Sequence, residues 1–361
     1  MQNFLEDRSG AIWIGTYGAG VSEYDHSANR FSLYRNDPYD PHTLSDNQVR
    51  AFVEDGAGNL WVGTDGGGLN RFDRAANQVT HYRQDPARPE GLPSDHVRAL
   101  TIDASGALWI GTLVGLARLD PGEEHFTLYR SDPANPAGLA SDALRANVRD
   151  RDGTLWVGTD DGGLHALDPR SGQLTRYSRG TADRHGLASN AVRALHIDPL
   201  GRLWVGTTDS GIWLWDREGD RFIHFGVGPP GGLPSPIAMS IHQDVGGTVW
   251  VGIFGGGLCK LDEVSRAFTC YTEQDGLPNN VIYGILEDEQ GDLWLSTNQG
   301  LSHFNPRTMA FTNYTTADGL QRNEFNGSAY DRSASGEMFF GGINGFNAFR
   351  PRSKMRLTFV E

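Results

Sequence analysis

The sequence predicts an all-β protein made of repeated four-stranded units, and three observations lead to this prediction. Seven tryptophans recur at steps of 44 to 48 residues along the 361-residue chain, which indicates repeated supersecondary units. Each lies among short runs rich in aromatic and β-branched residues, bounded by Gly, Asp and Asn, which is typical of strands and tight turns. No segment keeps the apolar period of a helix. The tryptophans are Trp13, Trp61, Trp109, Trp156, Trp204, Trp250 and Trp294, and Phe339 stands where an eighth would be.

The unit around Trp61 shows how its strands and turns are placed. Asp55 precedes Gly58 by three residues, so the Asp side chain can accept turn N–H groups while Gly adopts a positive φ. Trp61 falls in the second run, where its large apolar surface can fill the space between neighbouring sheets. The four runs are residues 49–55, 60–64, 69–73 and 78–83.

In the second to sixth units a glycine follows the tryptophan by two residues. We expect it to let the neighbouring sheet approach closely, because it has no side chain. These glycines are Gly63, Gly111, Gly158, Gly206 and Gly252.

Four antiparallel strands in some forty residues are the size of one β-propeller blade, and such sheets must stack into a closed ring to bury both faces. The chain reads as one region over residues 1–361, and we favour a single ring of eight blades. The alternative is seven blades plus one unit from a neighbouring propeller. The last unit would take its fourth strand from residues 355–360. The units are residues 1–43, 44–91, 92–139, 140–187, 188–233, 234–277, 278–320 and 321–361.

The composition narrows the range of partners. The net charge is −14 and the isoelectric point is near 5.2, which argues against nucleic acid or an anionic membrane surface. No run of about 18 apolar residues is present, so no contact with the membrane interior is expected in this segment.

Two cysteines, Cys259 and Cys270, lie in the third and fourth runs of the sixth unit. A hairpin register that pairs Leu258 with Tyr271 places them directly opposite each other, within reach of a disulfide. They either form that bond in an oxidising compartment or pack as two free thiols. Two cysteines without a nearby pair of histidines are too few ligands for a metal site.

No catalytic residues and no cofactor are predicted. The eleven histidines scatter over different runs and turns without a metalloprotease or nucleophile-elbow motif, and the repeated aspartates fall at turns. A propeller enzyme remains the main competing class of protein.

A polar position near the start of the innermost strand gives the candidate ligand site. Four consecutive units carry Arg there, namely Arg50, Arg98, Arg145 and Arg193. If they point into the channel they form a one-sided basic arc, suited to clamp carboxylate or sulfate groups. Alternatively each pairs with an acidic side chain, such as Glu54, and only organises the ring. Around the ring the position reads Gln2, Arg50, Arg98, Arg145, Arg193, Met239, Tyr283 and Ser328.

Two aromatic residues are added to this candidate site. Tyr283 holds the arc position in the seventh unit. Trp213 lies at a position that varies among Asn70, Ala117 and His165 in other units, so it either packs internally or offers a stacking platform for a sugar ring.

The units resemble the two-component regulator propeller repeat, whose hallmark is close to Asp-x-x-Gly-x-Leu-Trp-[Ile/Val]-Gly-Thr-x-x-Gly-Gly-Leu. This resemblance covers essentially the whole chain. In family members with two propellers of seven repeats, the unit eighth from the end closes the first propeller, which favours the seven-plus-one arrangement. The copies are residues 55–69, 103–116, 150–164 and 198–212, with looser ones at 244–258 and 288–301.

The resemblance implies the periplasmic ligand-sensing region of a bacterial receptor. Its output would be a hybrid histidine kinase or a diguanylate cyclase, with the catalytic part outside these residues. The expected partner is a small molecule, such as an oligosaccharide or another anionic compound, and a homodimer is compatible with the family. The alternatives are a lyase-type propeller enzyme acting on polysaccharides or lactones, and a scaffold propeller that binds another protein.

Overall fold

The computed structural model of the chain describes residues 31–351, apart from residues 77, 133, 136 and 180–185. Before residue 31 it describes only the backbone of three strands, β1 (Asn3–Glu6), β2 (Ile12–Thr16) and β3 (Gly20–Tyr24). The predictions for Gln2, for the side chain of Trp13 and for residues 355–360 therefore fall outside the described residues.

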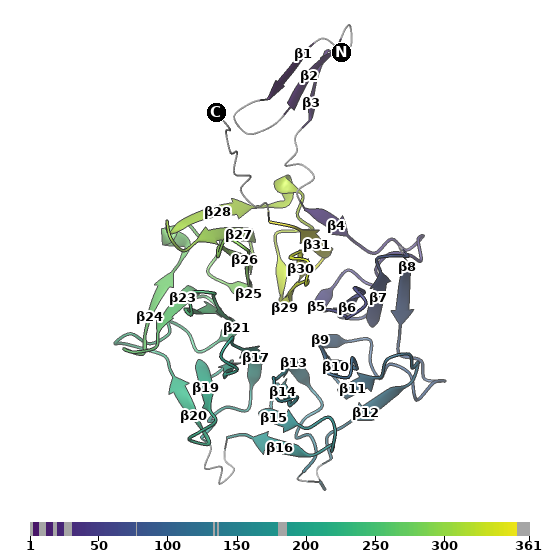
Figure 1. The fold of residues 1–361 in the computed structure, drawn as a ribbon, viewed down its shortest axis with the longest axis vertical. Coiled ribbons are helices and arrows are strands. Elements are labelled where there is room, and N and C mark those ends of the chain that lie inside the picture. The colour runs from purple at the N-terminus through teal and green to yellow at the C-terminus, as the bar shows by residue number, and fades with distance from the viewer. Residues whose placement is uncertain are drawn as a thin grey trace, which may run out of the picture.

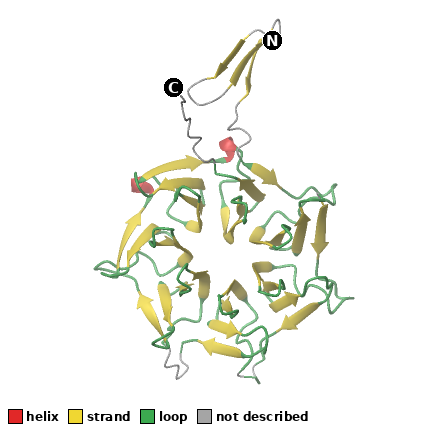
Figure 2. Cartoon of the chain, in the orientation of Figure 1, coloured by secondary structure: helices red, strands yellow, loops and turns green. Residues whose placement is uncertain are grey.

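The architecture is a ring of seven four-stranded antiparallel blades around a central channel (Figures 1 and 2). Six blades follow one another along the chain, each as a simple up-and-down sheet running outward from the channel. Blades 1 to 3 comprise β5 (Val49–Glu54), β6 (Leu60–Thr64), β7 (Leu69–Asp73) and β8 (Gln78–Tyr82); β9 (Val97–Ile102), β10 (Leu108–Thr112), β11 (Gly115–Leu119) and β12 (Phe126–Tyr129); and β13 (Leu144–Arg149), β14 (Leu155–Thr159), β15 (Leu164–Leu167) and β16 (Leu174–Tyr177). Blades 4 to 6 comprise β17 (Val192–Ile197), β18 (Leu203–Thr207), β19 (Ile212–Asp216) and β20 (Arg221–Phe225); β21 (Ala238–Gln243), β22 (Val249–Ile253), β23 (Gly257–Asp262) and β24 (Ala267–Tyr271); and β25 (Ile282–Glu287), β26 (Leu293–Thr297), β27 (Gly300–Asn305) and β28 (Ala310–Tyr314).

The seventh blade joins the two ends of the chain. Three of its strands come from the C-terminal part, β29 (Phe325–Arg332), β30 (Met338–Gly342) and β31 (Gly345–Phe349). The fourth is β4 (Ser32–Tyr34), which pairs with β31.

The expectation of an eight-bladed ring is therefore wrong. The first unit contributes only its last strand to the ring, and β1, β2 and β3 form a separate three-stranded sheet. The open edge of β31 is covered by β4, so no strand from residues 355–360 is needed to complete the seventh blade.

The repeated tryptophans form the core, as the sequence predicts. The six whose side chains are described are at most 7% exposed, and the indole N–H of each donates to the aspartate six residues earlier. In blade 1, Asp55 also accepts from the backbone N–H groups of Ala57 and Asn59, while Gly58 adopts a φ of 82°. One carboxylate thus fixes both the turn and the tryptophan.

The glycines that follow the tryptophans lie against the next blade, as predicted. A Cβ on Gly63 would lie 2.5 Å from Cγ1 of Val97, and one on Gly158 would lie 2.5 Å from Cγ1 of Val192. Both distances are too short for a real contact, so glycine is required where the sheets approach.

The hairpin of β23 and β24 carries a disulfide between Cys259 and Cys270. The register places these residues directly opposite each other, with Leu258 paired to Tyr271, as the sequence predicts. The disulfide, and not the pair of free thiols, is therefore the arrangement in the structure.

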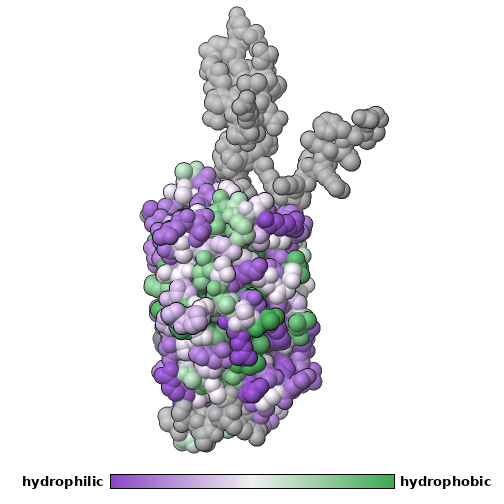
Figure 3. Space-filling model, turned by 90° about the vertical axis from the view of Figure 1, so that its left-hand side faces the viewer, coloured by the Kyte–Doolittle hydropathy of each residue, from purple (hydrophilic) through white to green (hydrophobic). Residues whose placement is uncertain are grey.

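The outer wall that carries β24 and β28 is mostly hydrophilic, with hydrophobic side chains in small separate groups (Figure 3). Among the described helices, which are the short 3-10 turns Glu273–Asp275 and Thr316–Asp318, none is long and apolar enough to cross a membrane.

Candidate functional site

The innermost strands line the channel, and the two ends of the channel differ. The connections between blades and the turns between second and third strands lie on one side, here called the inter-blade face. The turns within the first and last pairs of strands lie on the other side, here called the hairpin face. The arginine arc begins the innermost strands, so it lies toward the inter-blade face.

A β-bulge places the arc residues outside the regular pairing of their strands. In blade 1, Val49 pairs with Thr64 and Ala51 with Gly63, so Arg50 is an extra residue without a partner across the strands. The same shift occurs at Arg145 in blade 3 and at Arg193 in blade 4. A bulged residue is left out of the ladder, and its side chain is redirected.

Asp65 forms ion pairs with two members of the arc. Its Oδ2 accepts from Nε of Arg50 at 3.2 Å, and its Oδ1 lies 3.0 Å from Nη2 of Arg98 and 2.7 Å from Nδ1 of His96. Burial opposes the charge of Asp65, but the hydrogen bond from His96 and the two guanidinium groups lower its pKa overall. Arg98 does not line either of the channel cavities described below.

The other two arginines differ sharply from each other. Nε of Arg145 lies 2.5 Å from Oδ1 of Asp160. Arg193 has neither an ion pair nor a hydrogen bond to its Nε within the described part of the chain. Burial, followed by repulsion from Arg145, lowers the pKa of Arg193 to about 10. Attraction from Asp160 opposes this effect, and repulsion from Arg50 and Arg98 adds to it. The structure therefore brings the four arginines together, and among the described residues the guanidinium of Arg193 has no ion pair.

A wide bulge in β29 reaches across the channel to Arg193. Phe325 pairs with Gly342 and Tyr330 with Phe340, so residues 326–329 lie outside the ladder, with Ser328 at a φ of 66°. A Cβ on Gly327 would lie 2.6 Å from Nη2 of Arg193, so the two segments are in close contact. The contact joins blades 7 and 4, and Arg193 lines two cavities of the channel.

The cavity on the inter-blade face has a volume of about 500 Å³. Arg193 and Arg50 line it together with Tyr283, Met239 and Glu324. Burial raises the pKa of Tyr283, so the phenol keeps its proton at neutral pH. This cavity combines two cationic groups, a hydroxyl donor and one carboxylate.

The cavity on the hairpin face has a volume of about 550 Å³ and contains Asp331, a carboxylate that the sequence analysis did not single out. Asp331 and Glu54 line it with Arg145, Arg149 and Arg193. Burial raises the pKa of Asp331 to about 7, and the charge of Glu54 adds to the effect. Aligning the repeats could have found Asp331. It lies opposite the core residue Phe339, where blade 1 has the apolar Val53 opposite Trp61.

Trp213 lies away from both cavities. It is 5% exposed, stacks on His224 with ring centroids 4.0 Å apart, and donates from its indole N–H to Ser210. These are packing contacts, so we leave Trp213 out of the site proposed below.

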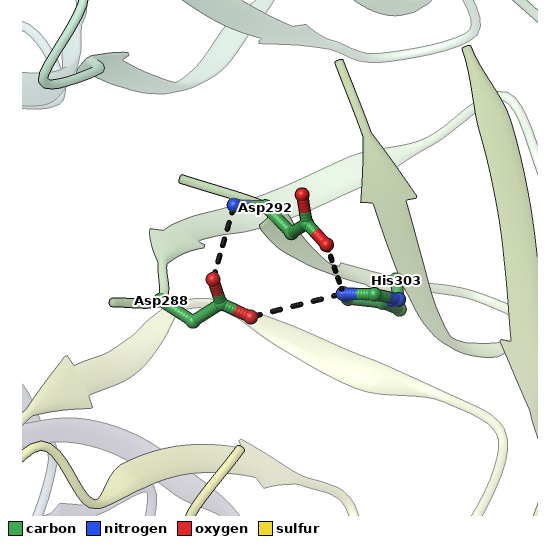
Figure 4. A group of neighbouring side chains, drawn as sticks. All are labelled: Asp288, Asp292 and His303. Atoms are coloured by element: carbon green, nitrogen blue, oxygen red, sulfur yellow. Dashed lines mark hydrogen bonds and ion pairs between the residues drawn. The ribbon is translucent and has the colours of Figure 1, made fainter. Parts of the chain in front are cut away.

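Asp288, Asp292 and His303 form a compact group in blade 6 whose potential ligand atoms lie within 4.8 Å of one another (Figure 4). Asp288 has the same role as the turn aspartates of other blades, accepting from the backbone of Asp292 and from the indole of Trp294. His303 packs on Trp294 with ring centroids 4.7 Å apart, as Arg118 packs on Trp109. The repeat explains Asp288 and His303, so we assign no metal to this group.

Four segments of the chain match the family described as two component regulator propeller. The chain therefore carries this family's propeller repeat, as the resemblance implied. A comparison with curated proteins gives no match. The matched residues are 43–66, 91–113, 186–209 and 276–299, each covering the first two strands of a blade.

The chain is similar to the extracellular domain assigned to the hybrid two-component system BT3049 of B. thetaiotaomicron. The TM-score is 0.78 at 25% identity, and the match covers 97% of this chain and 45% of that one. The chain thus spans less than half of that domain. The structure that it resembles is itself an extracellular domain.

Two further structures share the fold alone. Virginiamycin B lyase of Staphylococcus aureus has a TM-score of 0.66 at 14% identity, covering 89% of this chain and all of that one. PorZ, a surface component of the type-IX secretion system of Porphyromonas gingivalis, has a TM-score of 0.62 at 15% identity, covering 95% and 50%. Sensor, lyase and secretion-system proteins therefore use this architecture.

Proposed function

We propose that this propeller is a ligand-sensing region on the periplasmic side of a bacterial two-component receptor. The repeat family and the similarity to the extracellular domain of a hybrid two-component system support this proposal. The disulfide between Cys259 and Cys270 also fits an oxidising compartment. On this proposal the propeller is not itself catalytic, and the output reaction belongs to another part of the parent protein.

The unpaired guanidinium of Arg193 is the observation that carries the ligand proposal. A buried cation without a partner is costly, and a bound anion would relieve that cost. Arg193 borders a cavity of about 500 Å³ together with Arg50 and Tyr283. Arginine binds carboxylate and sulfate through paired hydrogen bonds, so the proposed ligand is a small molecule with such a group, for example an acidic oligosaccharide.

A thermal-shift screen of acidic and neutral oligosaccharides, amino acids and dicarboxylates tests this proposal. A ligand present at 100 times its dissociation constant should stabilise the protein by about 2.7 kcal/mol. The shift should disappear in Arg193→Gln and persist in Arg221→Gln, which changes an exposed arginine of β20. Wild-type protein that unfolds cooperatively but responds to no acidic compound would contradict the proposal, as would an equal shift in Arg193→Gln. Dimer formation stays a prediction, which sedimentation analysis can check.

A further inference from the structure

Three boundaries between blades are sealed by the same pair of aromatic rings. A tyrosine near the end of one blade's outer strand meets, edge to face, a phenylalanine at the start of the next blade's outer strand. Such pairs contribute beyond the apolar area that they bury. They are Tyr82 with Phe126 at 5.9 Å, Tyr177 with Phe222 at 5.6 Å, and Tyr314 with Phe31 at 5.3 Å between ring centroids.

The boundary between blades 7 and 1 has the tyrosine but lacks the phenylalanine. Tyr34 is the equivalent of Tyr82: it lies opposite Phe346 in blade 7, as Tyr82 lies opposite Leu69 in blade 1. The boundary phenylalanine of blade 2 is Phe126, which lies opposite Leu119. The equivalent residue of blade 1 is Val79, which lies opposite Phe72. Tyr34 is 41% exposed, whereas Tyr177 at a complete boundary is 8% exposed.

A cavity of about 390 Å³ lies where the missing ring would be. Its apolar wall includes Tyr34, Phe72, Val79 and Phe346. Tyr34 stacks on Phe346 with centroids 4.6 Å apart, and Phe72 stands edge-on to both rings at 6.2 and 6.1 Å. The cavity is therefore lined by the same kinds of ring that pack against phenylalanine elsewhere in the molecule.

The mouth of the cavity is polar. His42, Asp73, Arg74 and Glu337 line it, and Nη1 of Arg74 lies 2.8 Å from Oε2 of Glu337. The rim contains both hydrogen-bond donors and carboxylate acceptors, so it can bind a neutral hydroxyl or amide group whether that group donates or accepts.

We propose that this cavity binds a small molecule carrying one aromatic ring, which takes the place of the missing phenylalanine between blades 7 and 1. The ring lies edge to face with Tyr34 or Phe72, and the polar end of the molecule points to the rim. An apolar cavity of about 150 Å³ is enough to hold benzene, so this one has room for a substituted ring. The site is separate from the channel and does not depend on the ligand proposed there.

Fluorine NMR with 4-fluorophenol as the probe tests this inference. Wild-type protein should broaden or shift the fluorine signal in a saturable manner. Val79→Phe supplies the missing ring, so it should abolish the effect and raise the Tm by about 2 °C or more. Leu174→Phe places the same ring at the equivalent position of blade 3, opposite Leu167, and should leave probe binding unchanged.

Two results would overturn the inference: no saturable effect of wild-type protein on the probe, or the same effect in folded Val79→Phe. If Val79→Phe does not fold, Val79→Met fills the cavity with a more adaptable side chain and should weaken the signal change several-fold. Arg193→Gln should bind 4-fluorophenol as well as wild type does. Loss of binding in that variant would mean that the probe occupies the channel, which also overturns the inference.

Discussion

The side chain opposite the core aromatic residue is Val53 in blade 1 and Leu286 in blade 6, but it is Asp331 in blade 7. Its carboxylate accepts from the backbone N–H of Arg332 at 2.8 Å. Burial nevertheless dominates and raises the pKa of Asp331 to about 7. The same position holds His196 in blade 4 and His242 in blade 5. In blade 7 it places an aspartate whose pKa is raised to about 7 at the hairpin face of the channel.

Asp331 should make stability depend on pH. In the unfolded chain an aspartate has a pKa near 3.9, so between about pH 4 and pH 7 only the folded state holds this proton. The contribution is present in full below pH 4 and is lost as the pH rises through 7. Asp331→Asn should therefore gain stability relative to wild type with rising pH, by up to about 4 kcal/mol at 1.36 kcal/mol per pKa unit.

Urea unfolding of wild type and Asp331→Asn at pH 5 and pH 8 measures this difference. Burial lowers the pKa of His165 and His196 to about 4, so these two residues make the stability rise with pH. Both proteins contain them, so their effect cancels in the difference between wild type and Asp331→Asn. Asp161→Asn changes an exposed carboxylate and serves as the control. A stability difference that is the same at both pH values would rule out the proposed ionisation of Asp331.

The sequence predicts the positions of the arc but not its electrostatics. Aligning the repeats places Arg193 beside Arg145, because every blade has the same strand order. The partner Asp65 comes from a turn that follows the second strand, and only the bulged backbone brings it to Arg50. The bulge of β29 departs from the repeat, so no repeat pattern could predict that it reaches Arg193.

At the scale of the element, the blade is organised by one carboxylate and one close contact. The aspartate of the first turn accepts both turn N–H groups and the indole N–H, so the turn and the core tryptophan are coupled. These features follow from local sequence and were predictable. The glycines of the blade nevertheless differ. A Cβ added to Gly56 in the turn would meet no atom within 4 Å, whereas one on Gly158 would lie 2.5 Å from Cγ1 of Val192.

Gly158→Ala should destabilise the protein by about 1–3 kcal/mol, because the added methyl group overlaps the β-branched side chain of Val192 in the next blade. Gly56→Ala adds the same methyl group in a turn without a neighbour within 4 Å and should change stability by no more than about 0.5 kcal/mol. Urea unfolding monitored by tryptophan fluorescence compares the two. Equal effects would show that the approach of the blades does not limit the residue at position 158.

At the scale of the whole molecule, the ring closes through a blade made from both ends of the chain. β4 covers the edge of β31, and Phe31 packs edge to face on Phe349 with centroids 4.8 Å apart. The sequence predicts eight similar units but not which strand completes the last one. That choice depends on ring geometry, because a strand from the first unit and one from the C-terminal residues could both supply the missing edge.

Removal of residues 1–35 should therefore open the ring, whereas removal of residues 1–30 should leave it closed. The longer deletion takes away β4 and the buried Phe31, whose loss alone should cost about 3–5 kcal/mol. It also exposes the edge of β31 to other chains, so association should rise with concentration. Thermal unfolding and size-exclusion chromatography distinguish the two proteins, and equal melting temperatures would argue that β4 does not close the ring.

The pairing of β4 with β31 also decides how the molecule would yield to tension. Ser32 pairs with Ala348 and Tyr34 with Phe346, so the chain enters β4 and leaves β31 at the same end of the pair. A pull between the segments before residue 31 and after residue 351 would load these hydrogen bonds one at a time, as in unzipping, instead of all together in shear. Force from flanking segments would thus act first on the three-residue strand that closes the ring, and only then on the blades themselves.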